Sequence, residues 1–239
     1  MAKTRDSSDV DRYDHMVMNK PPLIAFDVNE TLLSLSPIQA RLEAIFGVDP
    51  PVGEWFARML HGSLVANAID NYRPFGDIGV EALLTVAVKR GLSLRGEEAV
   101  DVMSEMMSLP PHPDVPEALQ RLDGAGFVMV ALTNSSTVVA TDQIESAGLA
   151  SYLQRVISVE EVGRFKPDPA PYLHAARVMG VAIGDLTLVA AHDWDCAGAT
   201  AAGAGTVFVK RPGAVWSIPA DMPDVVVGDI ADLADLLID

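Results

Sequence analysis

The feature that most constrains the fold of this chain is a four-residue apolar run, Leu23–Phe26, that leads directly into an acidic residue, Asp27. Short continuous apolar runs are typical of strands in a parallel sheet that is covered on both faces. In an open α/β sheet, ligands bind beyond the carboxyl ends of the strands. The sequence therefore predicts that Asp27 faces a ligand, although an acidic residue in this place can also simply cap the following turn.

Composition predicts a globular protein that stays in the cytoplasm. Hydrophobic residues make up 49% of the 239 residues, which is sufficient for a core. No apolar run approaches the roughly 20 residues that span a bilayer, and the polar N-terminus lacks the apolar centre of a secretory signal. The single cysteine, Cys196, fits a reducing compartment. The formal net charge of −16 argues against nucleic acid or an anionic membrane as a partner.

The order of the predicted elements indicates an insertion within one core. Residues 1–20 are predicted to be a flexible N-terminal lead. Only helical patterns follow the first strand, which predicts a helical cap domain over 36–109, inserted into a core domain formed by 21–35 and 110–239. The predicted cap helices run from Ser36-Pro37 to Gly47, Trp55 to Ile69, Ile78 to Arg90 and Glu97 to Met107.

The second half of the chain alternates short apolar strands with helices. This alternation predicts an α/β fold, a doubly wound parallel sheet with helices on both faces and the first strand contributed from before the cap. The predicted strands are Phe127–Leu132, Val156–Val159, Thr187–Ala191, Thr206–Val209 and Val225–Val227, and predicted helices run from Asn134–Ser136 to Gly148 and from Asp168-Pro169 to Gly180.

Polar residues follow these strands at the edge where Asp27 is expected. Each has an ordinary structural alternative, as a helix cap, a solvated loop charge or a first-turn helix residue. Their occurrence at successive strand ends favours a shared site instead. The residues are Thr133 and Asn134, then Lys166, then His192, Asp193 and Asp195.

These residues form four motifs that resemble those of the haloacid dehalogenase superfamily, in the same order, over residues 22–210. The motifs are Asp27-Val28-Asn29-Glu30-Thr31, Leu132-Thr133-Asn134, Lys166-Pro167, and the acidic stretch that ends at Asp195 before Ala197-Gly198-Ala199. The resemblance implies a doubly wound sheet with an aspartate nucleophile after its first strand. Most members of the superfamily are phosphatases, so the resemblance alone does not name the reaction.

Departures from the phosphatase pattern argue against that branch. Its members have an aspartate as general acid two residues after the nucleophile, where this chain has Asn29, which cannot exchange a proton. They also bind Mg²⁺ through a Gly-Asp pair, and here Ala190 and Ala191 stand in its place. A magnesium-dependent phosphatase acting on a small phosphate ester is therefore the alternative, and a non-catalytic binding module of the same fold is a third interpretation.

The chain is more similar to type II L-2-haloacid dehalogenases, which need no metal. Lys166 and Tyr172 match that branch in KPDPAPY, and the Trp194-Asp195 pair matches it as well. Two departures stand out. The Ser-x-Asn of the branch is Ala190-Ala191-His192 here, and its halide-binding arginine has no direct counterpart, since Phe56 falls near that place and Arg58 follows two residues later.

The resemblance implies a reaction in two steps. Asp27, kept ionised by Lys166, would displace a halide from the substrate carbon to form an ester, and water would then attack the ester carbonyl, with Asp195 or His192 taking its proton. Arg58 is alternatively a solvated charge on an amphipathic helix, and Cys196, four residues after His192, is expected to be a packing residue rather than a nucleophile.

The predicted substrate is a small 2-haloacid, haloacetate or L-2-halopropionate, with no metal and no cofactor, and a homodimer is the usual state of similar enzymes. Predicted catalytic residues are Asp27, Lys166, Asp195, Thr31 and His192. Predicted substrate- or halide-binding residues are Arg58, Thr133, Asn134, Tyr172 and Asn29.

Overall fold

A computed structural model describes residues 21–238, in which six parallel strands form one sheet. The flexible lead predicted for residues 1–20 lies outside the described residues. The strand order β3-β2-β1-β4-β5-β6 places β1 in the middle, paired with β2 and β4. The predicted α/β fold is confirmed. The strands are β1 Leu23–Phe26, β2 Met129–Thr133, β3 Arg155–Ser158, β4 Leu186–Ala190, β5 Gly205–Val209 and β6 Val225–Val227.

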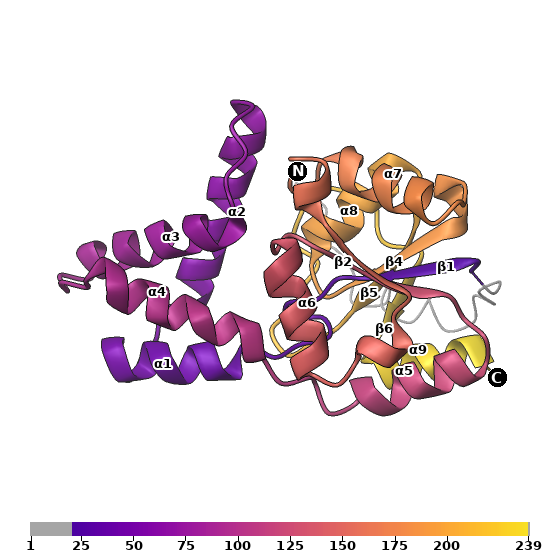
Figure 1. Ribbon diagram of the computed structural model, residues 1–239, viewed down its shortest axis with the longest axis horizontal. Helices are drawn as coiled ribbons and strands as arrows, with labels where there is room; N and C mark the ends of the chain where they lie inside the picture. The colour runs from indigo at the N-terminus through magenta and orange to yellow at the C-terminus, as the bar shows by residue number, and fades with distance from the viewer. Residues whose placement is uncertain (1–20, 239) are drawn as a thin grey trace, which may run out of the picture.

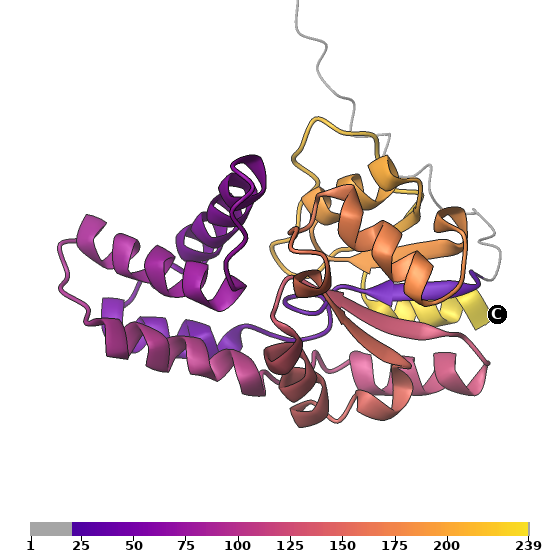
Figure 2. The same cartoon turned by 45° about the horizontal axis from the view of Figure 1, so that its top comes forward.

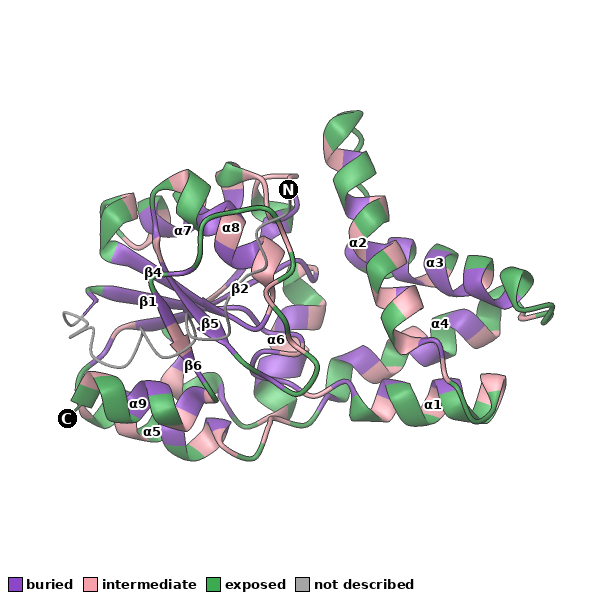
Figure 3. Cartoon of the chain, turned by 180° about the vertical axis from the view of Figure 1, so that it is seen from behind, coloured by how far each residue is buried: buried purple, intermediate pink, exposed green. Residues whose placement is uncertain are grey.

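Helices cover both faces of the sheet (Figure 1). On one face lie α5 (Val115–Gly124) and α9 (Ile230–Ile238), and on the other lie α7 (Pro169–Val178) and α8 (Asp193–Ala202). All four residues of β1 are buried, and they alternate between the two cores. Ile24 and Phe26 belong to the core that includes α5 and α9, whereas Leu23 and Ala25 belong to the core that includes α7 and α8. Figure 3 shows this burial along the strands. The continuous apolar run follows from burial on both sides.

Four of the five α-helices between β1 and β2, α1 to α4, group together beside the sheet (Figures 1 and 2). The sequence predicted each of them, but two begin three residues earlier than expected, directly after Pro51 and Pro74. Both prolines are the residues just before the first helical turn, where the missing proline N–H costs no helical hydrogen bond. The helices are α1 Ser36–Phe46, α2 Val52–Ala68, α3 Phe75–Lys89 and α4 Gly96–Ser104, which continues into a 3-10 turn over Glu105–Ser108.

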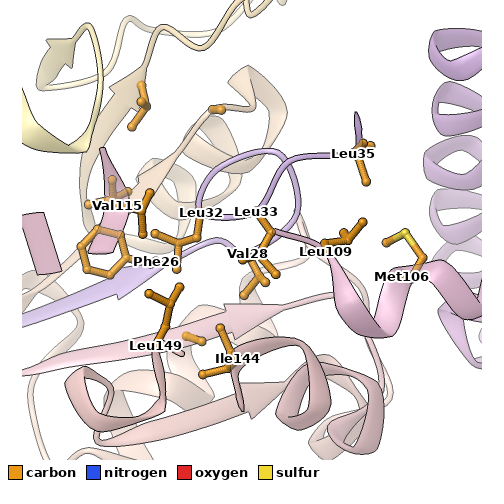
Figure 4. Packing of buried hydrophobic residues seen from close by; sticks show 14 of the residues in the cluster. Phe26, Val28, Leu32, Leu33, Leu35, Met106, Leu109, Val115, Ile144 and Leu149 are labelled. Atoms are coloured by element: carbon orange, nitrogen blue, oxygen red, sulfur yellow. The ribbon is translucent and has the colours of Figure 1, made fainter. Parts of the chain in front are cut away.

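The segment that leaves the sheet for these helices lies beside the segment that returns from them. The Ser34 N–H donates to the Pro110 carbonyl over 2.8 Å, and the His112 N–H donates to the Leu32 carbonyl over 2.9 Å. Figure 4 shows apolar side chains continuing from Phe26 toward Met106 of the helical group. The two crossings lie next to the predicted boundaries of the cap, and the division into domains stays a prediction.

Two helices of the core were not named from the sequence, α5 and α9. In α5 the buried residues Val115, Ala118, Leu119 and Leu122 follow helical spacing. The remaining helix, α6 (Thr137–Ser146), begins after Ser136, as predicted, and the Ser136 side chain accepts a hydrogen bond from the Val139 N–H. Within residues 21–238 no helix is both long and apolar enough to cross a membrane.

Candidate active site

Asp27 lies directly after β1, at the carboxyl edge of the sheet, with 4% of its surface exposed. Lys166 Nζ donates to its Oδ1 over 2.8 Å, while Thr31 Oγ1 and His192 Nδ1 lie 2.7 and 3.1 Å from its Oδ2. Thr31 Oγ1 also accepts the Ala191 N–H at 2.9 Å, so its single proton is directed at Asp27. Asp27 is thus a carboxylate fixed in orientation by three side chains.

Lys166 is buried between two carboxylates. Its Nζ donates to Asp27 Oδ1, to Asp195 Oδ2 at 2.6 Å and to the Leu132 carbonyl at 2.9 Å, which uses all three of its protons. The next residue, Pro167, packs against Gly198 of α8, where any Cβ would overlap the proline. The glycine in Ala197-Gly198-Ala199 therefore allows α8 to approach the loop that carries Lys166.

Asp195 is the second carboxylate that contacts Lys166, and Tyr172 in turn contacts Asp195. The Tyr172 hydroxyl donates to Asp195 Oδ1 over 2.6 Å, so each oxygen of this fully buried carboxylate has one donor. Burial raises the pKa of Asp195 above its ordinary value despite Lys166. Burial also raises the pKa of Tyr172 well above its ordinary value, so the hydroxyl keeps its proton and remains a donor.

The charges of the cluster keep Asp27 ionised. Burial alone would raise the pKa of Asp27, but Lys166 and His192 outweigh it and hold that pKa well below its usual range. Burial would likewise lower the pKa of Lys166, but Asp195 and Asp27 raise it. A carboxylate that stays ionised in a nearly dry site is the form required of a nucleophile.

His192 lies between two carboxylates and between two aromatic rings. Its Nδ1 faces Asp27 and its Nε2 lies 3.1 Å from Glu30 Oε2. The imidazole stacks on Phe56 of α2 and on Trp194, with ring centroids 5.6 and 5.1 Å away. Burial disfavours its charged form, but the hydrogen bonds to Asp27 and Glu30 raise the pKa of His192 to about 10. His192 is therefore an imidazolium that donates from both nitrogens near neutral pH.

The two asparagines of the motifs have different surroundings. Asn29 Oδ1 accepts from Gln143 Nε2 at 2.9 Å and its Nδ2 donates to Ser135 Oγ at 3.3 Å, so both of its polar ends have protein partners. Asn134 Oδ1 accepts the Lys166 N–H at 3.0 Å. This bond leaves the amide nitrogen of Asn134 as a donor toward the hollow that Asn134 lines. Thr133 Oγ1 accepts the Ser135 N–H at 3.1 Å and keeps its own proton for donation.

A small hollow, partly open to solvent, lies over Asp27, and the free space inside it is about 10 Å³, room for about one water molecule. The sheet side of this hollow is polar, and the side formed by α2 and α3 is apolar and aromatic. The character of this lining, polar on one side and apolar on the other, matches a small molecule with one polar end. Its lining residues are Asp27, Asn29, Phe56, Leu60, Phe75, Thr133, Asn134, His192 and Trp194.

Arg58 does not line the hollow, contrary to the expectation for a halide-binding arginine. Its Nε lies 3.3 Å from Glu54 Oε1, one turn earlier on α2. The reason is helical geometry: Phe56 faces His192, and two residues advance an α-helix by about 200°. Arg58 therefore points away from Asp27. The other nine predicted site residues lie at Asp27 or in its immediate surroundings.

Cys196 packs in the core, as expected. Its Sγ lies 3.9 Å from the Ala190 carbonyl and 3.7 Å from the Val207 carbonyl. Burial raises the pKa of the thiol well above its ordinary value, so the thiolate is strongly disfavoured. The alternative of a Cys-His nucleophile has no support in this geometry.

The neighbours of the site that sequence reasoning missed include Leu60 and Phe75 of the lining, Ser135, and three polar residues that contact the first motif or His192. Glu30 lies inside the first motif, and its acidic side chain between Asp27 and Thr31 was an available signal. The sequence around Gln143 of α6 and around Arg211 after β5 gave no signal, because each residue is far from the first motif in the chain and contacts it only in the folded protein. Arg211 donates two hydrogen bonds to the Thr31 carbonyl, at 3.1 and 2.9 Å, and so fixes the loop after β1.

Metal-ligating side chains do not gather here in the manner of a phosphatase. Ala191, where the phosphatase pattern has a magnesium-binding aspartate, uses its N–H to fix Thr31. Within the part of the chain that the structure describes, no group of three or more His, Cys, Asp or Glu side chains is arranged to hold a metal ion. The predicted absence of a metal remains a prediction.

Fold and site together define a class of protein: a doubly wound α/β enzyme fold with a buried, oriented aspartate after its first strand and a helical insertion beside it. The family model for haloacid dehalogenase-like hydrolases matches residues 21–203. The chain belongs to this family of hydrolases.

Individual relatives are similar over nearly their whole length. The (S)-2-haloacid dehalogenase H-109 of Pseudomonas putida is 28% identical over 221 residues, which cover 90% of this chain and 97% of that protein. Haloacetate dehalogenase H-2 of Moraxella sp. (strain B) is 26% identical over 213 residues, 88% of this chain and 95% of that protein.

Solved structures show the same architecture. A crystal structure of an L-2-haloacid dehalogenase matches with a TM-score of 0.86 and 25% identity, covering 92% of this chain and 99% of that one. The L-2-haloacid dehalogenase of Xanthobacter autotrophicus with chloropropionic acid covalently bound matches with a TM-score of 0.84, covering 92% of this chain and 98% of that one. At 23% identity, the second likeness concerns the fold alone.

Proposed function

We propose that the protein is a hydrolytic dehalogenase that converts small 2-haloalkanoic acids, haloacetate and L-2-halopropionate, to 2-hydroxy acids through an ester on Asp27. The relatives named (S)-2-haloacid dehalogenase and haloacetate dehalogenase support this reaction class. The observation that carries the proposal is the environment of Asp27, an ionised carboxylate held by Lys166 and Thr31 under an apolar, aromatic hollow.

The first step is displacement at the carbon that bears the halogen. One carboxylate oxygen of Asp27 forms a bond to this carbon while the carbon–halogen bond breaks and the halide leaves with the bonding electrons. No proton is needed on the leaving group, which agrees with an asparagine, Asn29, in the place of the phosphatase general acid. Lys166 and Thr31 fix the attacking group, which removes orientational freedom from the reaction.

Few polar groups of the hollow can contact the substrate. We assign a role to each from the donor proton that it does not use within the protein. Thr133 donates its hydroxyl proton to the substrate carboxylate, and the amide nitrogen of Asn134 donates to the departing halide beside the aromatic rings of Phe56 and Trp194. Arg58 takes no part in this scheme, since it pairs with Glu54.

The second step is attack of water on the ester carbonyl of Asp27. Asp195 has both oxygens engaged, by Lys166 and Tyr172, and does not line the hollow. We therefore assign Asp195 and Tyr172 the task of keeping Lys166 charged and in place. This leaves His192, which does line the hollow, as the group beside the ester.

The decisive experiment is halide release from chloroacetate and from the two enantiomers of 2-chloropropionate, with and without a chelator. We expect release from chloroacetate and the L-enantiomer at a rate that the chelator does not change. Phosphate release from phosphate esters that depends on added Mg²⁺ would instead establish the phosphatase alternative, and absence of both reactions would favour a binding module. A homodimer and a cytoplasmic location remain predictions, the former testable by light scattering on the purified protein.

A further inference from the structure

Arg211 is a buried arginine that follows β5 by two residues and contacts the first motif. Its guanidinium donates from Nε and Nη2 to the Thr31 carbonyl, at 3.1 and 2.9 Å. The strand order places β4 between β1 and β5, so these two strands do not pair with each other. The guanidinium therefore joins the loop after β1 to a strand that is not its neighbour in the sheet.

The Thr31 carbonyl depends on this partner because of where it lies. Thr31 is fully buried, in a turn between β1 and α1 rather than in a helix or strand whose ladder would supply a donor. A buried carbonyl without a donor costs free energy comparable to a lost hydrogen bond. Two donors on one planar guanidinium satisfy the Thr31 carbonyl and fix its direction as well as its position.

The guanidinium is itself held in place. Its Nη1 donates to Asp114 Oδ1 over 2.6 Å, and Asp114 Oδ2 accepts the N–H of Ile230, the first residue of α9, over 2.9 Å. The backbone of Arg211 is fixed too, since its N–H donates to the Val209 carbonyl and its carbonyl accepts the Ala214 N–H. Burial would raise the pKa of Asp114, but the hydrogen bonds from Arg211 and Ile230 outweigh it and lower that pKa. The carboxylate that holds Arg211 therefore stays charged.

Thr31 connects this fixed point to Asp27. Its hydroxyl accepts the Ala191 N–H at 2.9 Å and donates to Asp27 Oδ2 at 2.7 Å. Because the carbonyl and the side chain of Thr31 share one Cα, a shift of the carbonyl also moves the hydroxyl. Arg211 does not line the hollow over Asp27. The route from Arg211 to the reacting group therefore runs through Thr31.

We propose that Arg211 is a positioning residue, which fixes the Thr31 carbonyl and thereby holds the Thr31 hydroxyl against Asp27 for the attack on the carbon that bears the halogen. This inference rests on the proposed function and deepens it, because it assigns a residue outside the hollow to the first step. Lysine is no substitute at this place, since it lacks the planar fork that bonds the carbonyl twice and Asp114 once.

The test is single-turnover halide release, with the protein in excess over chloroacetate, for Arg211→Lys, Thr31→Val and the double variant. This experiment measures the maximal rate of ester formation and the protein concentration at half of that rate. For Arg211→Lys we expect the maximal rate to fall by about 10- to 100-fold, the scale for a displaced reacting group. The half-saturating concentration should stay within about twofold, because Arg211 does not line the hollow.

The double variant separates an effect through Thr31 from a general loosening of the structure. Thr31→Val keeps the shape of the side chain but removes the hydroxyl, so no hydroxyl remains for Arg211 to position. In the Thr31→Val background, Arg211→Lys should therefore lower the rate by less than about threefold. Its effect on the urea unfolding midpoint should be similar in both backgrounds, since the contact with Asp114 changes in each.

The Ala191 N–H provides a readout that needs no substrate. It donates to Thr31 Oγ1, so hydrogen exchange at Ala191 should be faster in Arg211→Lys than in the parent. Arg121→Lys is the matched control, because Arg121 pairs with Asp235 at a partly exposed place, 2.7 Å away. This control should keep the parent's rate of halide release, half-saturating concentration and exchange at Ala191.

Each outcome decides between the claims. A parent that releases no halide overturns the proposed function and this inference with it. If the parent is active, only this inference is wrong when Arg211→Lys keeps the parent's rate, loses the same factor in the Thr31→Val background, or leaves the exchange of Ala191 unchanged.

A second variant covers the case in which Arg211→Lys does not fold. Asp114→Asn keeps the guanidinium but removes the charge that holds it, so it should lower the rate of halide release by a smaller factor. Thr31→Val should again remove this loss. A rate equal to the parent's, or a loss that persists in the Thr31→Val background, would overturn the role of Arg211.

Discussion

The side-chain amide of Asn67 forms two hydrogen bonds with the backbone of Phe165, one residue before Lys166. Asn67 Nδ2 donates to the Phe165 carbonyl over 2.8 Å, and the Phe165 N–H donates to Asn67 Oδ1 over 3.0 Å. Asn67 is on the last turn of α2. Tyr72 stacks on the Phe165 ring, and Phe75 packs against that ring at a tilt. The helical insertion is therefore attached to the loop that places the lysine of the site.

Asn67→Ala should lower dehalogenation more than it lowers stability. Loss of both bonds loosens the contact between α2 and the Lys166 loop, so the apolar wall of the hollow, with Phe56 and Phe75, is no longer held over Asp27. We expect halide release to fall by about tenfold and the free energy of unfolding by about 1–2 kcal/mol. Asn71→Ala, an exposed change nearby, should leave both quantities unchanged. Equal losses in the two variants would contradict this explanation.

Asp27→Asn should remove turnover without unfolding the protein, because an amide cannot form the ester. The origin of the product oxygen provides an independent check on the parent. In a single turnover in heavy-oxygen water, the label should enter Asp27 and reach the 2-hydroxy acid only in later cycles. Label in the product of the first turnover would mean that water attacks the substrate directly.

The positions of the strands and of nine site residues could be predicted because their causes are local. A buried parallel strand is a continuous apolar run, and residues after such strands meet at one edge of the sheet. The direction of Arg58 could not be predicted, since it depends on which face of α2 packs toward the sheet. The contacts of Arg211 and Gln143 with the first motif join residues more than 100 positions apart, and no local pattern encodes them.

Arg58 and Asn134 give a paired prediction about the halide site. Arg58→Ala should keep halide release within about threefold of the parent, because the guanidinium pairs with Glu54 outside the hollow. Asn134→Ala should lower it by about 100-fold, which is the scale for loss of one oriented donor to a developing charge. Steady-state kinetics on chloroacetate measure both. A large loss of halide release in Arg58→Ala, without one in Asn134→Ala, would instead indicate that Arg58 binds the halide.

Stability should depend on pH through His192. Its pKa is raised from 6.5 to about 10 in the folded protein. A raised pKa means that the folded state binds the proton more tightly, so this contribution is complete below about pH 6.5 and is lost as pH rises through about 10. The difference in unfolding free energy between the parent and His192→Asn should therefore narrow from pH 7 to pH 10 in urea titrations. A constant difference across this range would show that His192 is not charged.

Lys166→Met should be the most destabilising of these substitutions. The methionine fills a similar volume, but it leaves two buried carboxylates, Asp27 and Asp195, without their shared cation. Removing one partner of a buried ion pair costs about 3–5 kcal/mol, because the remaining charge is uncompensated. Lys89→Met, at the exposed end of α3, is the control and should cost far less.

The cause of the Lys166→Met loss can be separated from a packing defect by pH and by a second substitution. Without the lysine, the pKa values of Asp27 and Asp195 rise, so acidification neutralises both groups before the protein unfolds. The stability gap between parent and variant should therefore shrink from pH 7.5 to pH 5, and Asp195→Asn in the same chain should recover part of it. A gap that is equal at both pH values, and unchanged by Asp195→Asn, would attribute the loss to packing and would remove the argument that Lys166 keeps Asp27 ionised.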